Sequence, residues 1–292
     1  MKKAKVYVQF PKTGLGNMLL VWSRGFVFAD INDLPFITSG WGGIRWGAWI
    51  RWERKKRTYW GYFKENTWRE RIRLAYQKRS SKIIHEPAVE QVSLQENEKA
   101  LFLFDRIFTD NDLFGPVRAH RSLIRKGIGD ILLPAMQRRL DEYTPPVISI
   151  HIRRGDFKFG NPITPTDFFI HSITLTREIT GKELPVTIFT DATPGEIKDV
   201  LALPNVTLSE DKPDILDILL MSRSKVIVLS QSSTFSYWGA FLSDAIIIKP
   251  DGDWQNDLRP ADVNKTVFEG KVNFNDEASV EKLKNGLKAY KW

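Results

Sequence analysis

A cluster of charged residues follows an apolar segment in the middle of the chain. Residues 147–152 (VISIHI) are short, apolar and rich in β-branched side chains, which predicts a buried strand. Arg153, Arg154, Gly155 and Asp156 come directly after it. Ligands of open α/β sheets bind at the carboxyl ends of strands, and a guanidinium group matches phosphate oxygens in shape and charge. The cluster predicts a diphosphate site, and the alternative is a surface loop salt-bridged through Asp156.

A second polar segment follows another apolar run. Residues 226–229 (VIVL) predict a strand, and residues 230–240 bring several hydroxyl groups to the start of an apolar helical stretch. A helix N-terminus carries unpaired N–H donors and a partial positive charge, so it attracts anions. We therefore expect Ser233, Thr234 and Phe235 to bind a diphosphate through hydroxyl and backbone donors. The alternative is a serine-rich helix cap without a ligand.

Three motifs resemble those of glycosyltransferase family 11, the bacterial and animal α-1,2-fucosyltransferases. Residues 151–156 (HIRRGD) resemble the HxRRGDY motif of that family, residues 232–240 (SSTFSYWGA) its NSTFSWWGAWL motif, and residues 14–17 (GLGN) its GLGNQ motif. The order and spacing of the motifs agree over about residues 14–244. The sequence departs from the family pattern at Met18, Phe157, Ser232, Tyr237 and Phe241.

The resemblance implies an α/β fold of the GT-B type, with two Rossmann-like domains facing a cleft. It also implies an inverting fucosyltransferase that transfers L-fucose from GDP-β-L-fucose to a glycan hydroxyl and forms an α-1,2 linkage. The C-terminal half would hold the nucleotide and the N-terminal half the acceptor. A different nucleotide sugar is the alternative donor. No cofactor is expected.

The resemblance assigns roles to several residues of the C-terminal half. Related α-1,6 and protein O-fucosyltransferases share the HxR motif, which implies that Arg153 stabilises the departing β-phosphate. Arg154 is expected to brace the loop. Asp217, on a helix predicted to begin near Pro213, stands where related enzymes carry an aspartate that reads guanine; the alternative is an exposed helix carboxylate. His151 contacts the base or ribose, or else is a core residue.

Four further residues are candidates for nucleotide binding. Asp191 follows a predicted strand at 186–190 and matches the middle motif of the family, so that it contacts the nucleotide or caps the next helix. Gly14, Gly16 and Asn17 are expected to approach the diphosphate from the opposite domain, because glycine lets the backbone come close to a ligand.

The catalytic base has no clear candidate in the sequence. Asp156 has suitable chemistry, but the two adjacent arginines favour its ionised form and make it a poor proton acceptor. Asn161 falls near the position of a proposed glutamate base in the α-1,6 enzymes, and an amide does not accept a proton usefully. Deprotonation assisted by phosphate would need no strong base. We therefore place Asp156 among the catalytic candidates and leave the role of base unassigned.

Two segments have the Asp-x-Asp form with which many other glycosyltransferases hold manganese. They are residues 110–112 and residues 251–253. The second follows Lys249-Pro250, and Asp-Gly there is also typical of a turn. Because arginine already supplies positive charge for the diphosphate, we expect no metal.

The elements that must position these residues follow an alternating pattern in the C-terminal half. Strands are predicted at 147–152, 186–190, 206–208, 226–229 and 245–249. Helical stretches separate them, which predicts a parallel sheet with helices on both faces. Pro145-Pro146 marks the expected domain boundary. We predict an acceptor domain at 1–145, a GDP-sugar domain at 146–265, and a C-terminal helix within 266–292 that packs back on the N-terminal half.

Composition is typical of a globular enzyme. The 292 residues can form two domains, and 42% of them are hydrophobic. There is no cysteine, which excludes disulfides and thiolate metal sites, and the four histidines are scattered. The apolar run at residues 6–10 is too short for a signal peptide, and no stretch is long enough to span a bilayer. We expect a cytoplasmic protein of bacterial or viral type.

Residues 45–79 form an unusually basic and aromatic segment. They include twelve Lys or Arg, three acidic residues and five tryptophans. Tryptophans can stack on acceptor sugars, and such surfaces also dock on anionic membranes, so peripheral membrane contact is one interpretation. A net charge of +8 also suits single-stranded nucleic acid. The plain alternative is a helix pair with core tryptophans. Nucleic-acid binding does not explain three ordered motifs, so we do not expect it.

Overall fold

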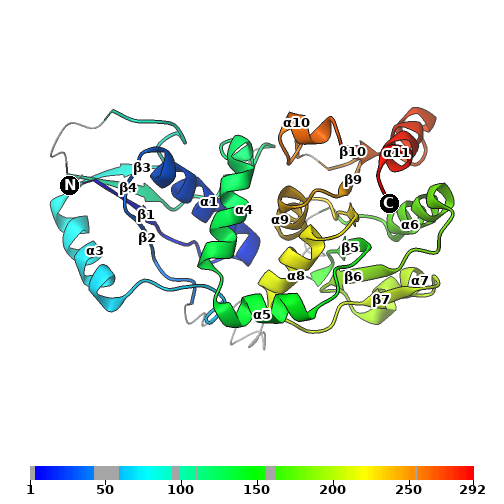
Figure 1. Ribbon diagram of the computed structural model, residues 1–292, viewed down its shortest axis with the longest axis horizontal. Helices are drawn as coiled ribbons and strands as arrows, with labels where there is room; N and C mark the ends of the chain where they lie inside the picture. The colour runs from blue at the N-terminus through cyan, green and yellow to red at the C-terminus, as the bar shows by residue number, and fades with distance from the viewer. Residues whose placement is uncertain (1–3, 43–58, 94–98, 109–110, 156–161, 254) are drawn as a thin grey trace. The chain divides into compact units, whose positions relative to one another are not determined.

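The structure is a computed structural model that describes residues 4–42, 59–93, 99–108, 111–155, 162–253 and 255–292. The chain forms two compact units, residues 1–138 and residues 139–292. Each unit contains one parallel β-sheet with helices packed against it (Figure 1). The predicted α/β class is therefore confirmed, and each unit is described by itself.

Unit 1 is built around a four-stranded sheet in the order β2-β1-β4-β3. All of its strand pairs are parallel. The strands are β1 (Lys5–Val8), β2 (Phe36–Thr38), β3 (Lys82–His85) and β4 (Ala100–Phe104). The helical elements are α1 (Leu15–Ile31), α3 (Trp68–Ser80), η1 (Arg118–His120), α4 (Arg121–Ile131) and α5 (Pro134–Glu142), which runs into unit 2.

Helix α1 packs closely on the central strand of unit 1. Val21 and Phe28 of the helix share a buried core with Val6, Val8 and strand β4. Gly25 lies where a Cβ atom would collide with the Val8 side chain, so the absence of a side chain lets the helix approach the sheet.

Two details of unit 1 differ from the sequence prediction. Gly14 and Gly16 do not form a separate glycine loop: Gly14 is the N-cap of α1, with φ −67°, and Gly16 already lies inside the helix. Residues 15–29 of this helix are almost continuously buried. Strand β4 was not predicted, although its five residues (ALFLF) are all buried.

Unit 2 contains a six-stranded parallel sheet in the order β10-β9-β8-β5-β6-β7. The strands are β5 (Ile148–Ile152), β6 (Val186–Thr190), β7 (Val206–Leu208), β8 (Val226–Val228), β9 (Ile246–Pro250) and β10 (Glu269–Val272). The five predicted strands are confirmed. When the strands are numbered from β5, the order reads 3-2-1-4-5-6 from the β7 edge, which is that of a dinucleotide-binding Rossmann fold.

Helices cover both faces of this sheet (Figure 1). The helical elements are α6 (Thr166–Thr180), η3 (Pro194–Ile197), α7 (Lys198–Leu201), α8 (Asp214–Ser222), α9 (Thr234–Leu242), α10 (Ala261–Asn264) and α11 (Glu277–Ala289). Ile148, Ile150 and Ile152 of β5 point into a core shared with α6 and α11. The alternate residues face α8 and α9: Ser149 Oγ lies 2.6 Å from Ser224 Oγ, and the His151 ring is 5.3 Å from that of Phe235.

The C-terminal segment was assigned to the wrong half of the chain. Residues 266–292 belong to unit 2, where β10 pairs with β9 and α11 packs against α6. Leu283 and Leu287 of α11 are fully buried in the core of this unit. The apolar side of the helix therefore covers the last strands of its own sheet. The division between the units also falls at 138/139, before the predicted Pro145-Pro146 boundary.

A buried ion network fixes β10 to the sheet. The Glu269 carboxylate of β10 forms ion pairs with Lys249 Nζ of β9 and with Arg259 Nε, each at 3.2 Å. All three side chains are at most 1% exposed. Arg259 also donates to the Ala245 carbonyl at 2.7 Å. Buried charges require such partners, so the three residues stabilise the end of the sheet as a group.

Within the described ranges, we find no helix with the length and apolar character needed to cross a bilayer.

Candidate active site

The loops after β5 and β8 meet at the point where the strand order of unit 2 reverses. β5 and β8 are neighbours in the sheet, and the helices that follow them, α6 and α9, lie on opposite faces (Figure 1). The Arg153 N–H donates to Ser230 Oγ at 2.9 Å, and that hydroxyl donates to the His151 carbonyl at 2.7 Å. Rossmann folds bind ligands at this position, beyond the carboxyl ends of the strands.

Arg153 is held by an aspartate from the neighbouring strand. Its Nη1 lies 2.6 Å from Asp191 Oδ2, and the two side chains are 25% and 19% exposed. The Arg154 N–H donates to Asp191 Oδ1 at 2.8 Å, so one carboxylate binds both residues. A Cβ atom on Gly155 would collide with Asp191, which explains the glycine in the motif. Asp191 does not cap the next helix, because the N-cap of η3 is Thr193, which forms a capping box with Glu196.

Arg154 braces the loop from inside. It is 6% exposed, and its Nη1 donates to the Arg153 carbonyl at 3.0 Å while Nη2 lies 3.4 Å from Thr166 Oγ1 at the start of α6. The guanidinium is therefore used to hold the backbone of the loop. Asp156, the other acidic candidate, lies outside the described residues, as does Asn161.

Helix α9 presents its N-terminus at the same edge of the sheet. Ser233 is the N-cap, and its side chain does not bond to the first turn of the helix. Thr234 and Phe235 form the start of that turn, with Phe235 against His151. Ser232 has φ +57°, a left-handed conformation that turns the chain from β8 into the helix. The N–H groups of this turn and the Ser233 hydroxyl form the donor set that the sequence predicted for an anion.

Two residues that fix this turn were not predicted. Ser230 joins the loops after β5 and β8, as described above. Thr164 is 1% exposed, and its Oγ1 accepts the Gln231 N–H at 2.9 Å, which ties the start of α9 to the segment before α6. Neither residue belongs to a periodic pattern, and only Ser230 falls within the predicted anion segment. Their roles depend on contacts between distant parts of the sequence.

His151 is a buried neutral residue. Burial and, to a smaller degree, the positive charge of Arg153 lower the pKa of His151 to about 3. The imidazole is therefore uncharged at neutral pH and cannot act as a general acid there. Its Nδ1 is buried and has no hydrogen-bond partner among the described residues. A ribose hydroxyl or a base edge would supply one.

Asp217 lies in the first turn of α8, on the face of the sheet to which His151 points. Its Oδ1 lies 3.2 Å from Ser209 Oγ and 3.4 Å from Lys212 Nζ. Lys212 Nζ lies 5.8 Å from the centre of the Phe189 ring, and Phe189 is the neighbour of His151 in the sheet. Burial raises the pKa of Asp217 to about 7, although Lys212 acts in the opposite direction. The sequence left open that Asp217 is an exposed helix carboxylate. In the structure its side chain is only 22% exposed.

The candidate residues of the N-terminal motif lie in unit 1, at the start of α1. Gly14 has open space where a Cβ atom would be, and Gly16 is buried in the helix. Asn17 Oδ1 is buried without a hydrogen-bond partner among the described residues. Contact of Gly14, Gly16 and Asn17 with a nucleotide stays a prediction.

The two Asp-x-Asp segments are engaged in structural contacts. Asp253 Oδ1 accepts the Tyr237 hydroxyl at 2.6 Å inside the protein, and burial raises the pKa of both groups. Asp251 lies 3.4 Å from the Asn273 amide, and Asp112 is paired with Arg118. Asp110 lies outside the described residues. Among the residues whose placement is described, no three His, Asp or Glu side chains gather in a way that could hold a metal ion.

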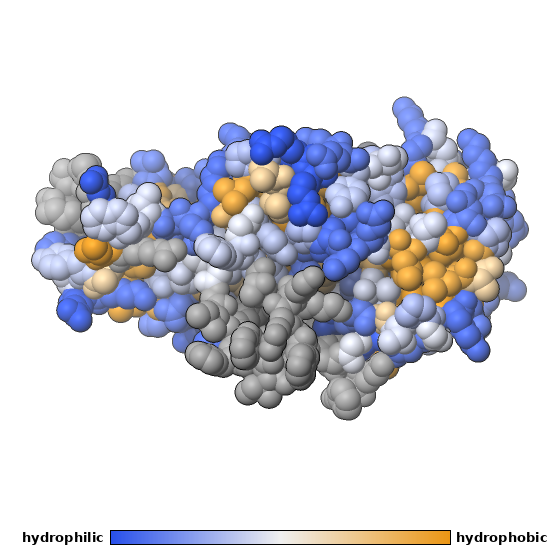
Figure 2. All heavy atoms as spheres, turned by 90° about the horizontal axis from the view of Figure 1, so that it is seen from below, coloured by the Kyte–Doolittle hydropathy of each residue, from blue (hydrophilic) through white to orange (hydrophobic). Residues whose placement is uncertain are grey.

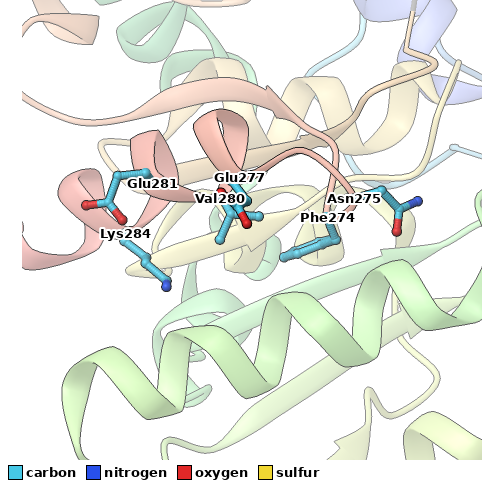
Figure 3. Close-up of a pocket in the computed structure, with 6 residues that line it drawn as sticks. All are labelled: Phe274, Asn275, Glu277, Val280, Glu281 and Lys284. Carbon is cyan, nitrogen blue, oxygen red and sulfur yellow. The ribbon is translucent and has the colours of Figure 1, made fainter.

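A shallow pocket of about 560 Å³ lies elsewhere in unit 2, beside α11. Figure 3 shows that Phe274 and Asn275 precede the helix and that Glu277, Glu281 and Lys284 extend from it. None of these residues is a site candidate. The two carboxylates that line the pocket would repel a diphosphate. The loops at the ends of β5, β6 and β8 therefore remain the better candidate.

The fold is similar to those of solved fucosyltransferases. NodZ from Bradyrhizobium matches with 12% identity over 85% of this chain and 96% of that chain, with a TM-score of 0.52. Arabidopsis thaliana FUT1, solved with GDP, matches with 11% identity over 89% and 76% of the two chains and a TM-score of 0.50. POFUT1 in complex with GDP matches with 10% identity over 82% and 95%, with a TM-score of 0.53.

These similarities establish the GT-B fold, in agreement with the prediction. A structure of NodZ, an α-1,6-fucosyltransferase, soaked with GDP-fucose also matches, with 13% identity over 87% of this chain and 97% of that chain and a TM-score of 0.52. No protein-family model matches the sequence. No curated protein matches it either.

Proposed function

We propose that the protein is an inverting glycosyltransferase that transfers L-fucose from GDP-β-L-fucose to a glycan hydroxyl. The observation that supports it most is that the Arg153 loop contacts, through Ser230, the loop that leads into α9, where the strand order of a Rossmann sheet reverses. The motif resemblance to family 11 supports an α-1,2 linkage. The fold similarity to GDP-binding fucosyltransferases supports the nucleotide.

In the proposed reaction the acceptor oxygen attacks C1 of fucose from the face opposite the diphosphate. The bond between C1 and the phosphate oxygen breaks, so the β-linked donor gives an α-linked product and GDP leaves. Negative charge grows on the β-phosphate in this step, and we assign the stabilisation of that charge to Arg153. A single well-placed donor of this kind contributes about 3 kcal/mol in a dry site. The acceptor proton goes to a base that we leave unassigned.

The remaining residues would bind the nucleotide. Ser233, Thr234 and the backbone at Phe235 would hold the diphosphate, and Asp217 would accept the guanine N1–H and 2-amino hydrogens, a pattern that adenine does not present. His151 would contact the ribose or the base as a neutral group. Gly14, Gly16 and Asn17 would approach from unit 1.

Calorimetric titration with GDP, ADP and UDP, first in EDTA and then with manganese, tests the nucleotide assignment. Selective GDP binding in EDTA is expected, and Arg153→Ala should weaken it while the exposed Arg138→Ala should not. Release of GDP from GDP-fucose in the presence of candidate glycans then tests the transfer. Preference for UDP or a strict manganese requirement would assign the protein to a different class of donor. Normal turnover by Arg153→Ala would contradict the mechanism.

A further inference from the structure

Lys212 is a buried lysine whose ammonium group is fully occupied. Its side chain is 3% exposed. Nζ lies 2.5 Å from Ser209 Oγ, 3.0 Å from the Glu210 carbonyl and 3.4 Å from Asp217 Oδ1. An ammonium group has three hydrogens, and three acceptors surround this one. The Tyr143 ring, with its centre 5.1 Å from Nζ, covers the group. Lys212 therefore has no donor to spare for a ligand.

These contacts involve only one of the two carboxylate oxygens of Asp217. Oδ1 is bonded to Ser209 and lies beside Lys212. Within the described part of the chain, no donor contacts Oδ2, and the side chain retains 22% exposure. A carboxylate held through one oxygen presents the other in a fixed direction. Preorganisation of this kind reduces the ordering cost of binding.

We propose that Lys212 is a positioning residue for nucleotide selection: together with Ser209 it fixes Oδ1 of Asp217, so that Oδ2 faces the guanine edge. This inference rests on the proposed function. Guanine offers two adjacent N–H donors to one acceptor, whereas adenine offers an acceptor at the matching ring nitrogen. Discrimination against adenine therefore requires an ionised and correctly turned carboxylate, and Lys212 contributes to both conditions.

The charged groups that face Asp217 act in opposite directions. Lys212 favours the ionised carboxylate, while burial and the nearby Asp214 favour the protonated one. Removing the lysine leaves the Ser209 hydrogen bond to favour the ionised form against burial and Asp214. Selection of GDP over ADP should then require a higher pH than in the native protein.

The test measures Kd for GDP and ADP between pH 5.5 and 9 for the native protein, Lys212→Met, Lys212→Arg and the exposed control Lys182→Met. For Lys212→Met we expect a GDP preference at pH 7 that is reduced about tenfold, the change that results from a shift of one pH unit in the ionisation of a required group. The preference should recover at high pH. Lys212→Arg should restore much of it, and Lys182→Met should match the native protein.

The outcomes separate the inference from the proposed function. A native protein without GDP preference contradicts the proposed function itself. A native protein with GDP preference, combined with an unchanged pH midpoint in Lys212→Met, overturns the role of Lys212. If Lys212→Met does not fold, Ser209→Ala removes the second contact to Oδ1 and must lower the GDP preference; an unchanged preference in that variant also overturns the inference.

A separate observation concerns helix α3 in unit 1. Trp68, Ile72 and Tyr76 lie four residues apart and are 66%, 61% and 73% exposed. Residues at this spacing share one face of a helix. Leu74, on another face, is 7% exposed and packs into a cluster with Tyr7 and the sheet. The helix is thus anchored on one side and presents a row of large side chains to solvent.

The charge of α3 indicates what this row contacts. Its sequence contains five Lys or Arg and one Glu. In the view from below (Figure 2), the end of unit 1 at the left shows orange and pale residues among blue ones. Interfacial helices combine Trp, Tyr and aliphatic residues on one face with basic residues that attract anionic lipid headgroups. We infer that α3 docks this protein on an anionic lipid bilayer.

Co-sedimentation with lipid vesicles tests this inference. The native protein should bind vesicles containing 30% phosphatidylglycerol in phosphatidylcholine, and pure phosphatidylcholine vesicles at least about tenfold less, because each basic residue near an anionic surface contributes roughly 1 kcal/mol. The variant Trp68→Ser/Ile72→Ser/Tyr76→Ser should lose binding, while the partly exposed control Leu208→Ser should not. Equal binding by the triple variant, no binding by the native protein, or preference for a single-stranded oligonucleotide over vesicles would overturn it.

Discussion

Arg153 Nη1 lies 2.6 Å from Asp191 Oδ2, and this ion pair connects the ends of the adjacent strands β5 and β6. The same carboxylate accepts the Arg154 N–H. The guanidinium that we assign to the leaving group is therefore held in place by a residue that need not contact the substrate. The strength of this arrangement can be measured by changing Asp191 or the neighbouring Gly155.

Replacing Asp191 by asparagine should weaken catalysis without removing the arginine. The amide keeps the size of the side chain and loses the charge that holds Arg153. We expect kcat/KM to fall about 10- to 100-fold, as is typical when a reacting group is misplaced by a small distance. Steady-state kinetics with GDP-fucose measure this. If Asp191→Asn has native kinetics, the ion pair does not position Arg153 for the reaction.

Gly155→Ala should resemble Asp191→Asn. The new Cβ atom would collide with the Asp191 carboxylate, which must move away from Arg153 to accommodate it. Because both changes disrupt the same pair, the double variant should be hardly worse than either single variant. Gly195→Ala is the matched control, since a Cβ atom there meets open space. Additive losses in the double variant would mean that the two residues act independently.

GDP binding should depend on the ionisation of Asp217. Its pKa is raised to about 7 in the folded protein, so guanine must select the ionised form and drive off a proton at lower pH. Below pH 7 the Kd for GDP should rise by up to about tenfold per pH unit. Calorimetry in buffers with different ionisation enthalpies would show proton release on binding near pH 6. Asp217→Asn should remove both the pH dependence and the release.

The same raised pKa has a consequence for stability. An aspartate whose pKa is higher in the folded state than in the unfolded chain stabilises the fold at pH values below the unfolded pKa, and this contribution is lost as the pH rises through about 7. The stability of Asp217→Asn should therefore vary less between pH 4 and pH 8 than that of the native protein. Denaturant unfolding at several pH values measures the difference.

Ser232→Asn should stabilise the protein. Ser232 has φ +57°, a conformation in which asparagine is more common than other non-glycine residues. The family that the motifs resemble has asparagine at this position. We expect a gain of about 0.5–1 kcal/mol, which corresponds to a Tm increase of roughly 1–4 °C in a chain of this size. Ser232→Ala should give no gain, because alanine has no preference for the left-handed conformation that this position requires. Equal Tm values for the Asn and Ala variants would contradict this explanation.

The sequence predicted five strands of unit 2, but it predicted neither the edge strand β10 nor the position of helix α11. Residues 148–152 and 226–228 are short buried runs of β-branched residues, so their pattern is local. Residues 269–272 (EGKV) have no such pattern, because the strand is held through a buried salt bridge to Glu269. A polar strand at a sheet edge is stabilised by partners that lie far away in the chain. The sequence of α11 predicts a helix with one apolar side, and it does not show which sheet that side covers.

The motifs located most of the candidate site but not its connections. Arg153 and Ser233 were found because charged or hydroxyl residues stand at the ends of apolar segments, and Asp217 was found through the family resemblance. Ser230 and Lys212 act through contacts across the sheet or within a turn, and neither residue type is unusual at its position. Pairing of Asp191 with Arg153 depends on β5 and β6 being neighbours, which periodicity alone does not show.

The network of Lys249, Glu269 and Arg259 also has a consequence for the order of events on the ribosome. Lys249 and Arg259 are synthesised before Glu269, the fully buried carboxylate that contacts both of them; Lys249 also lies 3.5 Å from Asp257, but that carboxylate is 62% exposed. Unit 2 should therefore complete its folding only after nearly the whole polypeptide has been translated. Unit 1 can fold earlier, since domains tend to fold from the N-terminus during synthesis. A premature stop codon after residue 265 would release a chain that lacks both β10 and the carboxylate that Lys249 and Arg259 share.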